Sequence, residues 1–299
     1  MAGFSDILSA ETMRRLDQLV LGSRWTAESG RAGRHSSVLK GASVEFRDHR
    51  DYVQGDSLRH LDWKLFGRSE RYFIKQFQEE TSLRVQLVMD ASASMAFQHS
   101  GHTSKFEFAR KLAAAVAYLA QHQQDSIGLV IYDDQVRHWL PARGGNRHVR
   151  NFLAALTDHQ ASGRTDTGKA LEALAEGMAR RGLVVMLSDM LDAPEAVFNA
   201  LAHFRRRGHD VILVQVLDPA ELNLPFEGIS DFIDMETGER LETDAALVRR
   251  AYQEAITTAI EDCRARCGAL RVEFQLATTD LAPEVFLTEL LAKRQRLGA

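Results

Sequence analysis

One stretch, Leu83 to Met95, constrains the fold of this chain more than any other. Its first part is a mainly apolar run without Gly or Pro, which is typical of a buried central strand. The run ends at Asp90, and hydroxyl side chains follow at Ser92 and Ser94. Because the carboxyl ends of strands in an open α/β sheet face the ligand crevice, we expect these three side chains to lie together at its rim.

After this stretch, buried-type runs alternate with amphipathic segments. This rhythm predicts a doubly wound, mostly parallel α/β sheet with helices on both faces. We expect further strands at residues 125–132, 183–187, 210–217 and 270–276, and an antiparallel edge strand at 136–140. The expected helices cover residues 5–21, 104–123, 146–157, 167–180, 194–207, 244–267 and 283–296.

The chain has two parts of different composition and expected structure. We expect residues 1–80 to form a helix, a loop and a polar-aromatic extension packed on the main domain, which spans residues 81–299. The main domain carries an insertion at about 218–243, with a small hairpin. A strand expected at residues 71–79 can pair with the opening strand as a second hairpin.

Residues 41–64 form a block in which charges of both signs alternate with large aromatic side chains. Between Ser23 and Lys75, eleven Lys and Arg face seven Asp and Glu, an excess too small to indicate a phosphate-backbone site. Two interpretations of the block stay open. It is either an ion-paired brace on the main domain or a docking surface for a partner protein.

Composition excludes several classes of protein. The net charge of −4 argues against a dedicated nucleic-acid binder. No segment approaches the roughly 18 consecutive apolar residues of a membrane span, and the N-terminus lacks a signal-peptide pattern, so we expect a cytoplasmic protein without an integral membrane segment. Cys263 and Cys267 have no further Cys or His neighbours at ligand spacing, and we interpret them as reduced thiols on a helix.

Two later segments add oxygen ligands to the edge that carries Asp90. One is the loop of residues 163–168, with two threonines and an aspartate, and the other is Ser188–Asp189 at the end of a buried run. Carboxylates and hydroxyls without Cys or His suit a hard cation, and Mg²⁺ or Mn²⁺ fits so compact a set better than Ca²⁺. The alternatives are that these side chains only cap helices and loops, or that the site is degenerate and binds no ion.

The pattern Asp-x-Ser-x-Ser, followed by a loop Thr and then an Asp, resembles the metal-ion-dependent adhesion site of the von Willebrand factor A fold. The resemblance assigns the ligand roles to five residues: Asp90, Ser92, Ser94, Thr165 and Asp189. Thr167 competes for the threonine role, and Thr165 is preferred because the loop Gly-Arg-Thr matches the form of that family there.

The remainder of the chain resembles a bacterial family of unknown function, DUF58. The resemblance rests on a block that includes Glu45-Phe46, Gly55-Asp56 and Asp62-Trp63-Lys64, and it extends from about Gly33 to Arg294. Relatives are typically encoded beside MoxR-type AAA+ ATPases. The resemblance therefore implies such an ATPase as a partner in chaperone-like assembly or maturation.

The sequence lacks a Gly-x-Ser-x-Gly elbow, a phosphate-binding Gly-rich loop and a His-Glu-x-x-His helix, so we expect no enzyme. The leading hypothesis is a metal-dependent protein–protein interaction module, in which an acidic residue of a partner completes the Mg²⁺ shell. The alternative is a Mg²⁺-dependent hydrolase or phosphatase, with Asp133, Asp166 or Asp192 as the general base. A third hypothesis has an empty site and the block of residues 41–64 as the sole contact surface.

Overall fold

The computed structural model describes residues 3–21, 36–37, 44–53, 61–69, 71–80, 83–99, 101, 103–162, 174, 176–178, 181–191 and 194–297. The chain divides into two compact units. The larger unit combines Met1–Ser23 with Leu83–Leu297, and the smaller one contains Arg24–Ser82.

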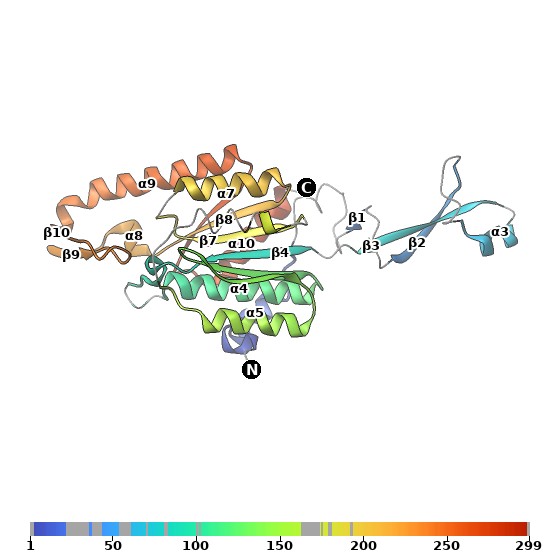
Figure 1. The fold of residues 1–299 in the computed structure, drawn as a ribbon, viewed down its shortest axis with the longest axis horizontal. Helices are drawn as coiled ribbons and strands as arrows, with labels where there is room; N and C mark the ends of the chain where they lie inside the picture. The colour runs from blue at the N-terminus through green and yellow to red at the C-terminus, as the bar shows by residue number, and fades with distance from the viewer. Residues whose placement is uncertain are drawn as a thin grey trace. The chain divides into compact units, whose positions relative to one another are not determined.

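The larger unit is built around a six-stranded sheet (Figure 1). In spatial order the strands are β11 (Glu273–Thr278), β8 (Asp210–Leu217), β7 (Leu183–Ser188), β4 (Arg84–Asp90), β5 (Ser126–Tyr132) and β6 (Val136–Arg143). All neighbouring pairs are parallel except β5 and β6, which are antiparallel. The predicted doubly wound α/β sheet with one antiparallel edge strand is confirmed.

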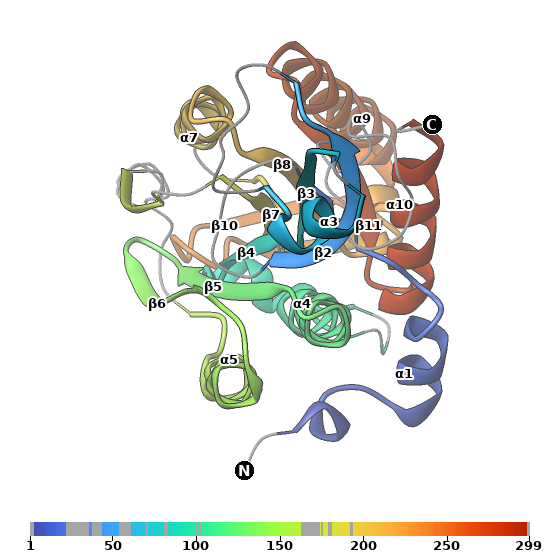
Figure 2. The same cartoon turned by 90° about the vertical axis from the view of Figure 1, so that its right-hand side faces the viewer.

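Helices cover both faces of this sheet (Figure 2). One face carries α1 (Ala10–Leu16), α4 (Lys105–His122), α5 (Asn146–Asp158) and α10 (Pro283–Leu297), and the other carries α7 (Pro194–Arg206) and α9 (Ala245–Ala269). Successive residues of β4 point to opposite faces, so Leu87 joins the first core and Val88 the second. β4 is therefore buried on both sides, as a central parallel strand requires.

The first segment of the chain belongs to the larger unit. The 3-10 turn η1 (Phe4–Asp6) precedes α1, which packs against α4 and α10. Leu16 is fully buried in the core of this face, and the Tyr118 hydroxyl of α4 donates a hydrogen bond to Asp17 Oδ1 at 2.8 Å. The expected packing of the later extension on the main domain stays a prediction.

An insertion follows β8. It contains the short helix α8 (Pro219–Asn223) and a hairpin of β9 (Ile229–Ile233) and β10 (Arg240–Asp244), and α9 follows directly. Ile229 lies opposite Asp244 in the antiparallel pair, so the small hairpin expected in the insertion extends over residues 229–244. None of the helices in the described ranges combines the length and apolar character that a membrane span requires.

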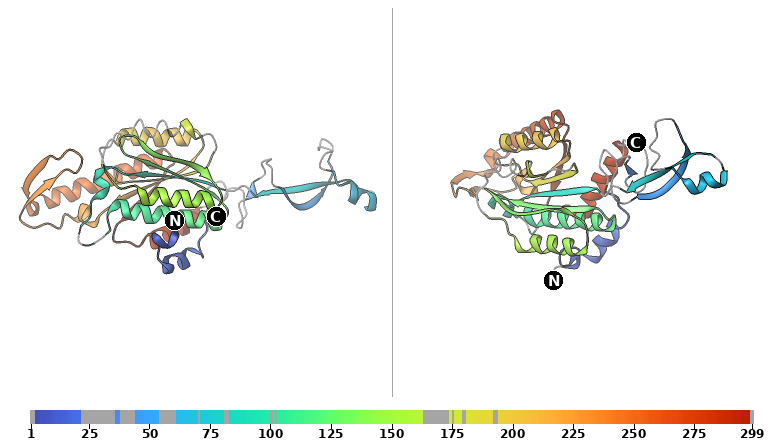
Figure 3. Two further views of the ribbon diagram at one scale, coloured as in Figure 1. Left: turned by 60° about the horizontal axis from the view of Figure 1, so that its bottom comes forward. Right: turned by 45° about the vertical axis from the view of Figure 1, so that its right-hand side comes forward.

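The smaller unit contains a three-stranded antiparallel sheet in the order β1 (Ser36–Ser37), β3 (Phe73–Glu80), β2 (Val44–Asp51), together with helix α3 (Trp63–Ser69) (Figure 3). The prediction that β3 pairs with the opening strand of the main domain is wrong, because β3 pairs with β2 and β1. The physical reason is that β4 already has parallel neighbours on both edges, β5 and β7, and so offers no free edge.

Parts of the polar-aromatic block stabilise each other within the smaller unit. Asp62 caps α3, because its Oδ1 accepts hydrogen bonds from the backbone N–H groups of Lys64 and Leu65 at 2.9 and 3.0 Å. The rings of Phe66 and Tyr72 stack with centroids 4.5 Å apart. Asp62 thus has a structural role in the block, and the two rings, which follow the block in sequence, pack together in the same unit; a docking role for the block stays a prediction.

Candidate metal centre

Two strand ends form the centre of the candidate site. From β4 the chain builds the sheet outward through β5 and β6, and then returns to place β7 on the other side of β4. β4 and β7 pair in parallel with Met89 opposite Leu187, so Asp90 and Ser188 leave the sheet side by side. Ligands of doubly wound sheets bind at the point where the strand order reverses in this way.

Asp90 ends β4 and is buried. Its Oδ1 accepts a hydrogen bond from the backbone N–H of Ser92 at 2.9 Å, and its Oδ2 accepts one from the Ser188 hydroxyl at 2.8 Å. The backbone is fixed as it leaves the sheet, because the N–H of Ala91 donates to the carbonyl of Tyr132 at 2.8 Å. Both donors to the carboxylate are neutral, so neither offsets its charge.

The two predicted serine ligands lie directly beyond Asp90. The 3-10 turn η3 (Ala93–Ala96) starts here, and the N–H of Met95 donates to the carbonyl of Ser92 at 3.1 Å. This turn brings the hydroxyl oxygens of Ser92 and Ser94 to 3.0 Å from each other. The structure thus gathers the Asp90 carboxylate and both hydroxyls on one tight turn at the edge of the sheet.

Asp189 follows β7 and is also buried. Its Oδ1 accepts a hydrogen bond from the backbone N–H of Leu191 at 3.2 Å, and its carbonyl accepts one from Gln215 Nε2 at 2.9 Å. Met190 has a φ of 60°, the left-handed conformation that is uncommon for a residue with a side chain, and this turns the chain sharply after Asp189. The second carboxylate oxygen of Asp189 binds Lys105.

Lys105 is a component of this site that sequence reasoning missed. It is the first residue of α4, and its side chain is 0% exposed. Its Nζ donates to Asp189 Oδ2 at 2.7 Å and to Glu221 Oε1 at 2.6 Å. One sequence signal indicates such pairing: a lysine directly after the N-cap Ser104 lies at the positive end of the helix dipole, where a cation is disfavoured unless acids surround it.

Glu221 joins helix α8 to the site. The Asp218 side chain accepts a hydrogen bond from the N–H of Ala220, and Glu221 Oε2 accepts one from the N–H of Asp218, which together form a capping box. Since Glu221 Oε1 accepts from Lys105, one carboxylate both caps α8 and binds the ammonium. Asp218 Oδ2 also accepts from the N–H of His99, in the loop beyond the serines, at 3.3 Å.

Burial shifts the ionisation of these groups. Burial, and next the charge of Asp189, raise the pKa of Asp90 from its ordinary value of 3.8 to about 6. Burial raises the pKa of Glu221 as well, although Lys105 acts in the opposite direction. Burial opposes the charge of Lys105, but the two carboxylates outweigh it and the pKa of the ammonium is raised. Asp189 and Glu221 therefore share one ammonium, and Asp90 adds a third carboxylate beside Asp189, so negative charge is in excess among the described residues of this edge.

The donors at this edge fit a hard divalent cation. Carboxylate and hydroxyl oxygens are the ligands that Mg²⁺ and Mn²⁺ prefer, and a dication would balance the excess charge. The buried Tyr132 hydroxyl has no partner at hydrogen-bonding geometry in the described part of the chain, and burial, then Asp90, hold its pKa well above the usual range. Within the same ranges no three Asp, Glu, His or Cys side chains group at metal-ligating spacing, so the serine hydroxyls would supply part of the shell.

Some predicted residues fall outside the described ranges. These are Thr165, its competitor Thr167, and the candidate bases Asp166 and Asp192. The third candidate base, Asp133, is described, and its two carboxylate oxygens accept from Arg137 Nε at 2.7 and 2.6 Å. Burial is the largest influence on the pKa of Asp133 and favours a higher value, but the hydrogen bonds and charge of Arg137, together with hydrogen bonds involving Asp134 and the backbone of Gln135, lower the pKa, which makes this carboxylate a poor proton acceptor.

Residues 48–262 match the family described as protein of unknown function DUF58, and this match covers more than half of the chain. The chain belongs to the DUF58 family. This member is 29% identical over 252 residues to the uncharacterized protein Rv1480 of Mycobacterium tuberculosis, a match that covers 81% of the chain and 78% of the relative. It is 31% identical over 145 residues to the uncharacterized protein MAV169 of Mycobacterium avium, covering 45% and 85%.

Two solved structures are similar to this DUF58 member at low identity. The conserved hypothetical protein BatB from Bacteroides thetaiotaomicron matches at 15% identity and a TM-score of 0.49, covering 72% of this chain and 100% of that one. An aerotolerance-related membrane protein from Bacteroides fragilis matches at 17% identity and a TM-score of 0.48, with the same coverage.

The raised pKa of Asp90 predicts a dependence of stability on pH in the presence of EDTA. The folded state holds a proton on Asp90 that the unfolded state has already released between about pH 4 and pH 6. The free energy of unfolding should therefore fall by up to about 3 kcal/mol as the pH rises through this range. Urea unfolding at several pH values measures this fall. In Asp90→Asn the part due to Asp90 should be absent, and parallel pH profiles of the two proteins would contradict the assignment.

Proposed function

We propose that this protein is a metal-dependent protein–protein interaction module. Asp90, Ser92 and Ser94 would hold a Mg²⁺-type ion, with Thr165 as a further ligand and Asp189 acting through water. When bound, the ion supplies an electrophilic position for a carboxylate of a partner protein. The observation that supports the proposal is the buried edge at the switch point, where carboxylates and hydroxyls converge with an excess of negative charge.

Residues of this chain orient the proposed ligands before an ion binds. Ser188 and the backbone of Ser92 fix both oxygens of the Asp90 carboxylate, so its orientation is set before any ligand arrives. The turn η3 presents the two serine hydroxyls together. Fixed donors of this kind bind an ion without a large loss of side-chain entropy, and they give the partner contact a defined direction.

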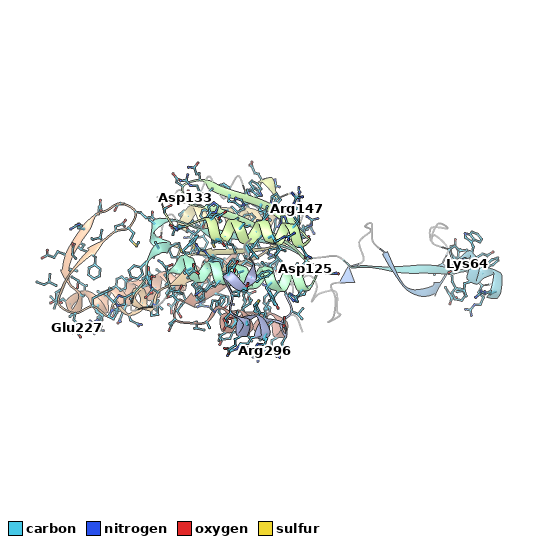
Figure 4. The ribbon with its side chains drawn as sticks, turned by 90° about the horizontal axis from the view of Figure 1, so that it is seen from below. Lys64, Asp125, Asp133, Arg147, Glu227 and Arg296 are labelled. Atoms are coloured by element: carbon cyan, nitrogen blue, oxygen red, sulfur yellow. The ribbon has the colours of Figure 1, made fainter. Side chains whose placement is uncertain are left out.

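A protruding surface beside the site supports a binding role. The docking hairpin, defined here as residues 226–247, includes β9 and β10 and exposes several large apolar side chains: Ile229, Ile233, Met235, Leu241 and Leu247. It also carries seven acidic residues against Arg240 alone, an excess larger than the net charge of −4 of the whole chain. Figure 4 shows Glu227, one of these acids, at the base of the hairpin. Exposed apolar groups among acids suit a partner surface that is apolar and basic.

The hairpin and the metal centre are connected by direct contacts. The His99 ring packs on Phe226 with centroids 4.9 Å apart, and Phe226 packs on Phe232 of β9 at 5.5 Å. Helix α8, which Glu221 joins to Lys105, leads into the same hairpin. We therefore infer a partner that meets both features at once, with a carboxylate for the ion and a basic, apolar surface for the hairpin.

The resemblance to the DUF58 family suggests the kind of partner. We propose a MoxR-type AAA+ ATPase, acting with this chain in chaperone-like assembly or maturation. A hydrolase or phosphatase built on the same ligands is not put forward as a second function. Of its three candidate bases the structure describes Asp133, and that carboxylate is held by Arg137 with a lowered pKa.

Asp90→Ala is expected to abolish metal-dependent capture of the partner, because it removes the one carboxylate that both holds the ion and lies on the serine turn. Affinity capture on the immobilised protein, in Mg²⁺ and in EDTA, with mass spectrometry of the bound proteins, measures this. The matched control is Asp262→Ala, which removes an exposed aspartate on α9. Capture that is the same in EDTA, or that survives Asp90→Ala in a folded protein, would refute the proposal.

Leu241→Ser is expected to weaken capture of the same partner by about tenfold, the effect of losing one well-placed apolar anchor. Leu241 is 63% exposed, so the substitution should leave the free energy of unfolding within about 0.5 kcal/mol of wild type and should not change Mg²⁺ binding. Titration of the captured partner onto the variant measures the loss. Val20→Ser, at another exposed apolar residue of the larger unit, is the control, and equal losses in both variants would contradict a role of the hairpin.

A further inference from the structure

The side chain of Lys105 is placed where a cation has two reasons to be unstable. It is fully buried, and it starts α4 at the positive end of the helix dipole. Two ion pairs offset the cost of burying this charge: the Lys105 Nζ lies 2.7 Å from Asp189 Oδ2 and 2.6 Å from Glu221 Oε1. The Phe97 ring, with its centroid 5.9 Å from Nζ, adds a weaker attraction.

The ammonium gives Asp189 a charged hydrogen-bond donor, whereas the donors that the described residues give Asp90 are neutral. Each carboxylate oxygen of Asp189 already accepts a hydrogen bond, Oδ1 from the N–H of Leu191 and Oδ2 from Lys105, and the second of these donors is charged. Asp90 instead accepts from a hydroxyl and an N–H, which are both neutral. A dication bound directly by Asp189 Oδ2 would share that oxygen with the ammonium, so the two positive charges would repel each other or the charge-assisted hydrogen bond, about twice as strong as a neutral one, would have to break.

Glu221 keeps the ammonium in this position. Its Oε2 accepts from the N–H of Asp218 in the capping box of α8, so the carboxylate cannot turn away from Lys105 without opening the start of that helix. Lys105 is thus held between the end of β7 and the start of α8, in direct contact with Asp189.

We propose that Lys105 is a built-in counter-ion of the metal centre, which holds Asp189 away from direct coordination and thereby weakens the affinity for a divalent ion. This inference rests on the proposed metal site and deepens it. Lys105 stabilises the site when no ion is bound, because it neutralises part of the carboxylate charge. It also keeps the ion exchangeable, because a fixed positive charge opposes a dication nearby. Lys105 is therefore a positioning residue, and it need not touch the ion.

Four proteins test the proposal: the wild type, Lys105→Met, Glu221→Gln, and the double variant Lys105→Met with Glu221→Gln. Lys105→Met removes the ammonium with little change in length. The double variant has the same charge balance at the site as the wild type, because one positive and one negative group are removed together, and the new amide can still accept from the N–H of Asp218. Isothermal titration with Mg²⁺ alone, and thermal unfolding in EDTA, are the measurements.

In EDTA, Lys105→Met should lower the Tm by about 10 °C, since it leaves the buried Asp189 and the part-buried Glu221 without their cation. Its affinity for Mg²⁺ should nevertheless rise by about tenfold, and Glu221→Gln alone should bind Mg²⁺ more weakly than the wild type. The double variant should also bind Mg²⁺ more tightly than the wild type, although its charge balance is the same. That result would separate the effect of the hydrogen bond between Lys105 and Asp189 from the effect of the net charge of the site.

If Lys105→Met does not fold, the double variant tests the proposal, because replacing both members of a buried ion pair lowers the folding stability far less than removing one. Wild-type affinity in the double variant, or in a folded Lys105→Met, would overturn the role of Lys105 while the proposed metal site stands. Mg²⁺ binding by the variants but not by the wild type would support the role of Lys105 and contradict the proposed function. Absence of binding in all four proteins would overturn both.

Discussion

The parallel pairing of β4 with β7 is the constraint on which the rest of this structure depends. Both strands are buried, β4 ends at Asp90 and Asp189 directly follows β7, so their pairing places the two acids at one edge of the sheet. Two carboxylates in a buried place repel each other, which is one cause of the raised pKa of Asp90. The contacts around this edge of the sheet either offset the negative charge of the two carboxylates or orient them.

Among the residues that the structure describes, the compensation is only partial. Lys105 neutralises one charge, and Glu221, which holds Lys105 in place, introduces another. The neutral donors Ser188 and Ser92 orient Asp90 without balancing it. An excess of buried negative charge lowers the stability of a fold, and such a cost is typical of functional sites. In the proposed function a divalent ion and a partner carboxylate complete this balance.

Much of the fold follows from local sequence patterns. The strand that ends at Asp90 is apolar enough to be recognised as buried on both sides, and the turn after it contains the serines at fixed spacing, so the placement of Asp90, Ser92 and Ser94 was predictable. The pairing of β3 was not, because strand neighbours depend on which edges are free, and that is a property of the whole sheet. Lys105 and Glu221 were missed for a similar reason. They are 116 residues apart, and their contact exists only once α4 and α8 pack at the same edge.

The central claim is that a divalent ion binds at the switch point of the sheet, and Mn²⁺ tests it most directly through its anomalous X-ray scattering. In crystals grown with Mn²⁺, one anomalous peak should lie within about 2.2 Å of the hydroxyl oxygens of Ser92 and Ser94, with Asp90 beside it. Lys105 should remain bonded to Asp189 in that structure. No peak at this edge at saturating Mn²⁺, or a peak bound by other residues alone, would contradict the claim.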